Sequence, residues 1–169
     1  MFVVRLSIWI ALVAWLAGPV SALVGRDHAP WQRTARFFWT LGCAVYLVHV
    51  AAAFHVVHGW SHTAALAATA SETATVTGVE SGMGLWLNYV FTLLWVADAA
   101  WWWRLGVQAY RRRPRWIGGM LYGFMIFMAF HATVVFEGGW VRVSGVAGSA
   151  LLLALLLVAA RRISRQGAS

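Results

Sequence analysis

The chain has 169 residues, of which 62% are hydrophobic and only 11% are charged, less than half the usual charged share of a soluble domain. Its net charge of +8 comes from arginine alone, because the sequence contains no lysine. The arginines are confined to short segments between apolar runs, which argues against a nucleic-acid-binding surface and for a lipid bilayer as the surrounding medium. A single cysteine, Cys43, excludes an intrachain disulfide and a thiolate zinc cluster.

Five apolar runs approach or reach the roughly 20 residues that a membrane-spanning helix needs. They cover residues 6–24, 37–59, 84–103, 117–136 and 143–160. Arginines cluster after the first, third and fifth runs, so the positive-inside rule predicts an N-terminus outside and a C-terminus inside. The first run also resembles a signal peptide ending at Ala22, but its removal would place Arg111–Arg113 outside. We therefore expect one domain, residues 1–169, folded as an all-α membrane bundle of five transmembrane helices.

Composition also predicts the membrane boundaries of these spans, the nature of the longest loop and the kind of membrane. Tryptophan prefers the headgroup level of a bilayer. The outer boundary is then marked by Trp60, Trp86 and Trp140, and the inner one by Trp31, Trp39, Trp101–Trp103 and Trp116. The longest loop, residues 60–83, is external and rich in alanine and threonine, and Ser61 can cap a short helix within it. An all-arginine basic set with abundant alanine and valine is typical of a GC-rich bacterium, so we expect the bacterial inner membrane.

Small residues predict which spans pack closely, since lipid tails give helices little hydrophobic reason to associate. The fourth run carries Gly119 and Gly123 in GxxxG spacing, and the fifth carries Ser144, Gly145, Gly148 and Ser149. We expect these two spans to form a close hairpin.

Histidines at the end of the second run are the main functional signal. His55, His58 and His62 follow i, i+3, i+7 spacing and would project within about 60° of one another on one helix. Ionisable side chains at this depth are costly and usually functional. On a common depth scale one layer, about 7–10 Å outward of the helix centres, would contain His55, Asn88, Tyr89 and His131, with Glu137 nearer the surface.

Imidazoles with a carboxylate are the ligands that suit copper, zinc or non-haem iron. We therefore predict a transition-metal site whose ligands are His55, His58, His62, His131 and Glu137, oriented by Asn88 and Tyr89. An enzyme built on so apolar a layer would act on a lipid or quinone-like substrate, although the sequence identifies no reaction.

Three alternatives remain open for the same residues. Each histidine can be a hydrogen-bonded core residue that links neighbouring helices. His131 with His55 or His49 can supply the two axial ligands of a b-type haem. The chain can also be a cofactor-free structural or assembly subunit that joins other membrane subunits or a second copy of itself.

Asp98 is the one acid inside a span, and a carboxylate without a partner there would protonate. Tyr122 lies at a similar depth in the fourth span and can donate a hydrogen bond to it. The residue is then either part of a proton path or a structural hydrogen-bonding group. The structural role is favoured, because no further acid or histidine continues a path to the inner face.

Overall fold

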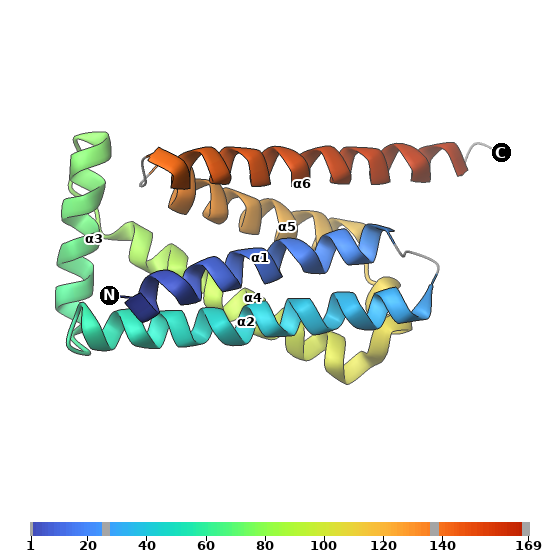
Figure 1. The fold of residues 1–169 in the computed structure, drawn as a ribbon, viewed down its shortest axis with the longest axis horizontal. Coiled ribbons are helices and arrows are strands. Elements are labelled where there is room, and N and C mark those ends of the chain that lie inside the picture. Colours follow the sequence, from blue (N-terminus) through green and yellow to red (C-terminus); the bar gives the residue numbers. More distant parts are fainter. Residues whose placement is uncertain (1, 25–27, 136–138, 167–169) are drawn as a thin grey trace.

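The computed structural model describes residues 2–24, 28–135 and 139–166, and these residues form helices and no strand. Five long helices run along the molecule (Figure 1): α1 (Phe2–Val24), α2 (Ala29–Val56), α4 (Met83–Arg111), α5 (Arg115–Phe130) and α6 (Gly139–Gln166). Helix α3 (His62–Thr77) lies across one end of them, and a π-helical turn, η1 (His131–Val135), follows α5.

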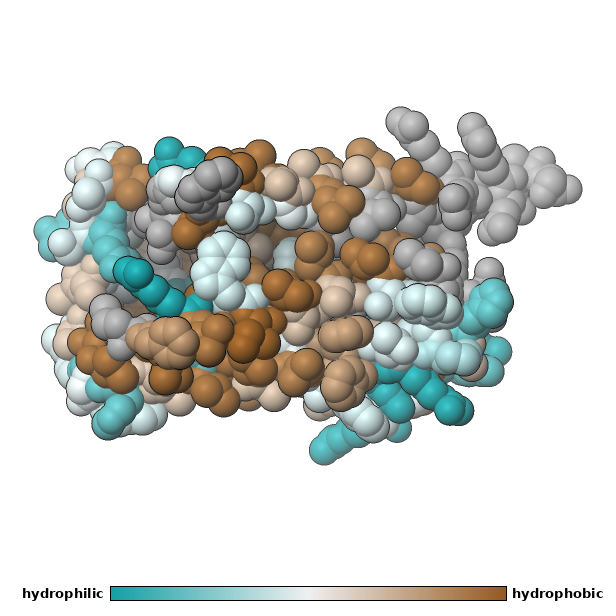
Figure 2. Space-filling model, in the orientation of Figure 1, coloured by the Kyte–Doolittle hydropathy of each residue, from teal (hydrophilic) through white to brown (hydrophobic). Residues whose placement is uncertain are grey.

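The two ends of the bundle differ in chemistry. The end covered by α3, where α2 ends and α4 begins, is called the histidine end because residues 55–62 lie there (Figure 1). The opposite end, where α2 begins and α4 ends, is called the arginine end because it carries Arg33 and Arg111–Arg113. Figure 2 shows hydrophobic residues over the middle of the bundle and hydrophilic ones gathered beyond them at the arginine end.

Within the described residues, four helices are long and apolar enough to cross a membrane. They are Phe2–Leu23, Ala29–Val56, Met83–Arg111 and Trp116–Val134, which include the first four predicted spans almost entirely. The chain is accordingly an all-helical protein with the features of a multi-pass membrane protein. The fifth predicted span, residues 143–160, lies within α6, which is not among the four, so five spans and their orientation stay predictions.

A glycine in α2 lets three helices, α1, α2 and α4, meet closely. A Cβ on Gly42 would lie 2.9 Å from the Trp95 ring of α4 and 3.1 Å from the backbone N of Trp15 in α1. In the predicted hairpin, Gly145 does approach η1 so closely that a Cβ would overlap Thr133. Gly119 and Gly123 have open space around them, so their GxxxG spacing does not mark a contact.

The core is aromatic. Trp39, Trp95 and Met125 are its largest fully buried side chains. The ring centroids of Trp39 and Trp95 lie 5.5 Å apart, and Tyr46 lies 5.5 Å from Trp95. The prediction that Trp39 and Trp102 mark a membrane boundary is therefore wrong, since 0% and 3% of their surfaces are exposed. Their rings fill space between helices instead of meeting headgroups.

The short helix expected in the 60–83 loop is confirmed as α3. Ser61 precedes it, and its hydroxyl oxygen accepts a hydrogen bond from the Ala64 N–H at 3.1 Å, which satisfies one of the free donors of the first turn. Gly78 ends the helix in a left-handed conformation, with φ of 77°. Both ends of α3 are therefore set by local sequence.

Candidate functional site

The predicted histidine face depends on α2 continuing past His58, and it does not. Helix α2 ends at Val56. Gly59 and Trp60 then have φ of 55° and 61°, which turns the chain toward α3. The Trp60 N–H donates to the Phe54 carbonyl at 2.8 Å, and the Ser61 N–H donates to the His58 carbonyl at 2.9 Å, which closes this turn. The prediction that three histidines share one helical face is therefore wrong.

Each of those three histidines instead contacts an aromatic neighbour. The Trp60 indole N–H donates to His55 Nδ1 at 3.2 Å. His58 meets the Phe54 ring edge-on at 5.7 Å between centroids. His62 stacks on Tyr89 and lies 2.9 Å, Nδ1 to hydroxyl oxygen, from it. The histidine end is thus an aromatic cluster in which imidazoles act as ring and hydrogen-bonding partners.

The two histidines further along the spans bond mainly to backbone. His131 Nδ1 lies 3.0 Å from the Phe127 carbonyl oxygen one turn earlier in α5, and it packs on the Phe127 ring at 4.1 Å. His49 Nδ1 lies 2.9 Å from the Val4 carbonyl oxygen, which links α2 to α1. The His49 contact matches the alternative in which histidines link neighbouring helices, whereas the His131 contact is local and links none.

No three His, Cys, Asp or Glu side chains within residues 2–24, 28–135 and 139–166 lie where they could hold one metal ion. Glu137, the predicted carboxylate ligand, is outside those residues. Tyr89 contacts His62, whereas Asn88 is exposed and its backbone carbonyl accepts from the Thr92 hydroxyl. The gathering of ligands on which the metal prediction rests is not found in the described part of the chain.

Asp98 has the most elaborate polar surroundings among the described residues. Its side chain is 5% exposed and forms an ion pair with Arg113, whose side chain is 8% exposed. The Tyr110 hydroxyl donates to the other carboxylate oxygen at 2.7 Å. This arrangement agrees with the structural interpretation of Asp98, although the donors differ from the one expected.

A break in α4 makes this site. Tyr110 follows Asp98 by 12 residues, which would separate them by about 18 Å along a straight helix. At Gly106, φ is 74° and ψ is 171°, a conformation that only glycine adopts readily. The chain therefore leaves the helix axis and turns back (Figure 1), so that Tyr110 and Arg113 reach the carboxylate.

Aromatic rings enclose the ion pair. The Tyr110 ring stacks on Trp102 with 4.2 Å between centroids. The Arg113 guanidinium lies over the same Tyr110 ring, 4.0 Å from its centroid, and 5.9 Å from the Tyr122 centroid. Burial opposes the charged form of Arg113, but its neighbours Tyr110 and Asp98 outweigh that effect and raise its pKa. Arg113 is therefore a permanent cation held beside a buried carboxylate.

Relatedness to known proteins does not identify a function. Comparison of the chain with family models, curated proteins and solved structures finds no match. What the protein does must be inferred from the side chains that the fold brings together.

An apolar groove of about 420 Å³ lies beside Asp98, between α4 and α5. We call it the α4/α5 groove; the residues that matter here are Leu94, Asp98, Trp101, Trp116, Met120 and Phe124. Among the described residues that line it, Asp98 is the single charged one, and the other side chains are apolar or aromatic. Met120 and Trp116 are 69% and 66% exposed, so the groove opens on the side of the bundle that would face lipid.

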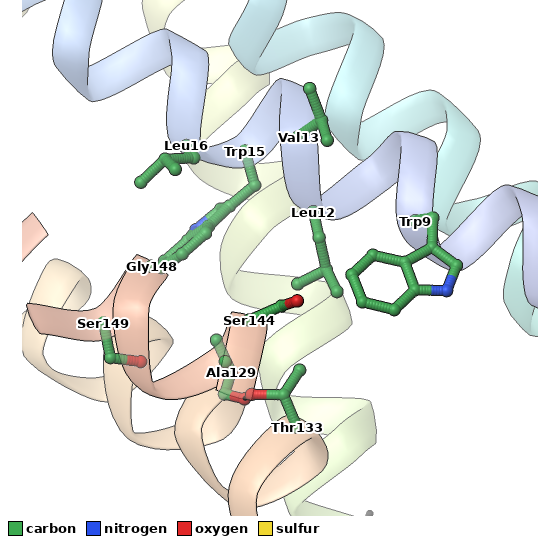
Figure 3. A pocket seen from close by; sticks show the side chains of 11 residues that line it. Trp9, Leu12, Val13, Trp15, Leu16, Ala129, Thr133, Ser144, Gly148 and Ser149 are labelled. Carbon is green, nitrogen blue, oxygen red and sulfur yellow. Dashed lines mark hydrogen bonds between the residues drawn. The ribbon is translucent and has the colours of Figure 1, made fainter. Parts of the chain in front are cut away.

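A smaller cavity of about 200 Å³ lies between α1, the end of α5 with η1, and α6 (Figure 3). Trp9 and Leu12 line it from α1, and Ser144 and Ser149 line it from α6. The Thr133 hydroxyl at its edge donates to the Ala129 carbonyl at 2.7 Å, within its own helix. None of the described residues that line this cavity is charged, which makes it a weaker candidate than the α4/α5 groove.

Sequence reasoning missed Tyr110 and Arg113 as partners of Asp98. Both lie beyond the predicted third span, residues 84–103, and a straight helix would carry them away from the carboxylate. The available signal was Gly106, a helix-breaking residue before a tyrosine and three arginines. Tyr122, the expected donor, is the neighbour of Arg113.

Proposed function

We propose that this membrane protein binds a ring-bearing, hydroxylated lipid of the quinol type in the α4/α5 groove. The observation that carries the proposal is a lone carboxylate, Asp98, among apolar and aromatic side chains in a groove open toward lipid. Small-molecule sites commonly combine mainly apolar walls with a few polar groups that fix orientation. The volume of about 420 Å³ is within the usual range for such sites.

The chemistry of the groove favours a hydroxyl donor with a planar ring. Trp101, Trp116 and Phe124 provide flat surfaces for stacking. Asp98 accepts hydrogen bonds from Tyr110 and Arg113, and a carboxylate offers about four acceptor positions, so it can accept from a ligand hydroxyl as well. An apolar tail would continue along Leu94 and Met120 into the bilayer.

Binding of a short-tailed benzoquinol to the purified protein in lipid nanodiscs tests this proposal. Leu94→Trp fills the groove, whereas Leu93→Trp places the same ring on the neighbouring position, which is 69% exposed and does not line the groove. We expect Leu94→Trp to weaken binding at least about tenfold, equivalent to about 1.4 kcal/mol, and Leu93→Trp to leave it unchanged.

The oxidised form of the same ligand provides a second comparison. A benzoquinone has no hydroxyl to donate, so it should bind about 10- to 100-fold more weakly than the quinol if Asp98 accepts that hydrogen bond. Equal affinity for both forms, or equal loss in the two tryptophan variants, would refute the site. Absence of quinol binding would favour the structural or assembly subunit instead.

The transition-metal and haem assignments stay predictions. Metal analysis of the purified protein, wild type against His55→Ala with His58→Ala, tests the first. Stoichiometric metal that disappears in the double variant would support a histidine site formed with groups outside the described residues. An absorption spectrum of the same sample tests for a haem held by His131 with His49 or His55.

A further inference from the structure

A basic pocket at the arginine end has a chemistry that the α4/α5 groove does not share. It lies between the start of α2 and the end of α4 and has a volume of about 560 Å³. Its polar lining consists of Gln32 and Arg33 from α2 with Gln108, Arg111 and Arg112 from the end of α4. Arg33, Arg111 and Arg112 are all exposed, so their guanidinium groups are accessible from outside the bundle.

Positive charge exceeds negative charge around this pocket. The sequence has five acids, and Asp98 is already paired with Arg113. Glu72 is part of α3, which covers the opposite end, and Glu80 follows that helix. Asp27 is the one further acid close to the pocket in sequence, and it lies outside the described residues. Even with Asp27 counted, three lining arginines leave an excess of cations.

The start of α2 adds to the same field. Helix α2 is 28 residues long and carries no side-chain hydrogen bond at its N-cap, His28. Backbone N–H groups of a first helical turn carry partial positive charge and attract anions. Arg33, Arg112 and Gln108 with this helix start provide the donors that a phosphate group prefers.

The pocket also lies at the level where a phospholipid headgroup would be. Three exposed tryptophans occur at the same end of the bundle: Trp31 in α2, Trp103 in α4 and Trp116 in α5. Exposed tryptophans mark the headgroup region of a bilayer. Basic pockets between membrane helices at that depth bind anionic headgroups.

We infer that the basic pocket holds the phosphate group of an anionic phospholipid such as phosphatidylglycerol. The guanidinium groups of Arg33 and Arg112 contact the phosphate oxygens, and the acyl chains lie along the outside of the bundle. This inference does not depend on quinol binding in the α4/α5 groove, because the two sites share no lining residue.

Lipid retention by the full-length protein tests the inference. The protein is purified in detergent, phosphatidylglycerol or phosphatidylcholine is added, and bound lipid is counted by native mass spectrometry. The test variant is Arg33→Gln with Arg112→Gln. The control is Arg5→Gln with Arg104→Gln, which removes the same charge from two exposed arginines that do not line the pocket. Thermal melting checks that both variants are folded.

We expect wild type to retain phosphatidylglycerol in preference to phosphatidylcholine. The pocket variant should lose about 30-fold in affinity for phosphatidylglycerol, which corresponds to about 1 kcal/mol for each arginine, and the control should lose less than threefold. Equal losses in both variants would overturn the inference, since general charge attraction would explain them. Equal retention of the two lipids would overturn it too.

A third arm separates a lipid headgroup from a free phosphate. Inorganic phosphate is titrated at millimolar concentration against the lipid-free protein and against the phosphatidylglycerol complex. Weak binding and no displacement of the lipid support a headgroup site. Tight binding of inorganic phosphate that is lost only in the pocket variant would assign the pocket to a soluble phosphate and overturn the lipid assignment.

Discussion

Removing the guanidinium of Arg113 would leave the Asp98 carboxylate buried without its cation. The two side chains are 8% and 5% exposed, so water cannot replace the lost partner. Breaking a buried pair by removing one member costs about 3–5 kcal/mol. For a chain of this size about 1 kcal/mol shifts the melting temperature by about 2–4 °C. Arg113→Ala should therefore lower it by about 6–20 °C.

The assay is thermal unfolding of the purified protein in detergent, followed by tryptophan fluorescence and by loss of the monodisperse gel-filtration peak. Arg104→Ala is the matched control, because Arg104 is exposed and should change the unfolding free energy by no more than about 0.5 kcal/mol. Replacing both partners, Asp98→Leu with Arg113→Met, should recover part of the loss, since no charge is then left buried. If Arg113→Ala and Arg104→Ala have the same melting temperature, the ion pair contributes nothing to stability and the reasoning is wrong.

Three further substitutions test the backbone and packing arguments in the same melting assay. Gly106→Ala should destabilise by about 1–3 kcal/mol, because its φ of 74° and ψ of 171° suit only glycine; Gly119→Ala, inside a helix with open space around it, should be neutral or stabilising by up to about 1 kcal/mol. Gly42→Ala should cost about 1–3 kcal/mol, because the new Cβ would lie 2.9 Å from an indole ring. Ser61→Ala should cost α3 about 1 kcal/mol, detected as faster amide hydrogen exchange at Ala64. A loss in Gly119→Ala equal to the other two glycine variants would show that these positions are not distinguished by geometry.

Local rules predicted the parts of the fold that are determined locally. The length of an apolar run indicates a spanning helix without knowledge of its neighbours, and four of the predicted runs correspond to such helices. Helix α3 was predictable because Ser61 caps it from the adjacent position. Packing was less predictable. Gly119 and Gly123, in GxxxG spacing, contact no neighbouring helix, whereas Gly42, which belongs to no such motif, contacts the Trp95 ring of α4.

The prediction of a histidine face is wrong because α2 ends at Val56, before His58 and His62. The spacing of His55, His58 and His62 has meaning only on one continuous helix, and Gly59 is the first of two residues with positive φ that turn the chain. His55 and His58 then contact the nearby rings of Trp60 and Phe54. The partner of His62 is Tyr89 of α4, which no short-range pattern encodes. For Asp98, burial inside a span made the need for a hydrogen-bonding partner predictable. Which residue is the partner was not predictable, because Tyr110 reaches Asp98 only through the turn at Gly106.

The turn at Gly106 also joins two regions that are otherwise separate. Residues 107–112 contribute Gln108, Arg111 and Arg112 to the basic pocket, while Tyr110 of the same segment reaches Asp98. A headgroup held by Arg112 would restrict the movement of this segment and keep the Tyr110 hydroxyl on the carboxylate. Coupling between two equilibria is reciprocal, so loss of the hydrogen bond between Tyr110 and Asp98 would in turn weaken attachment of the lipid.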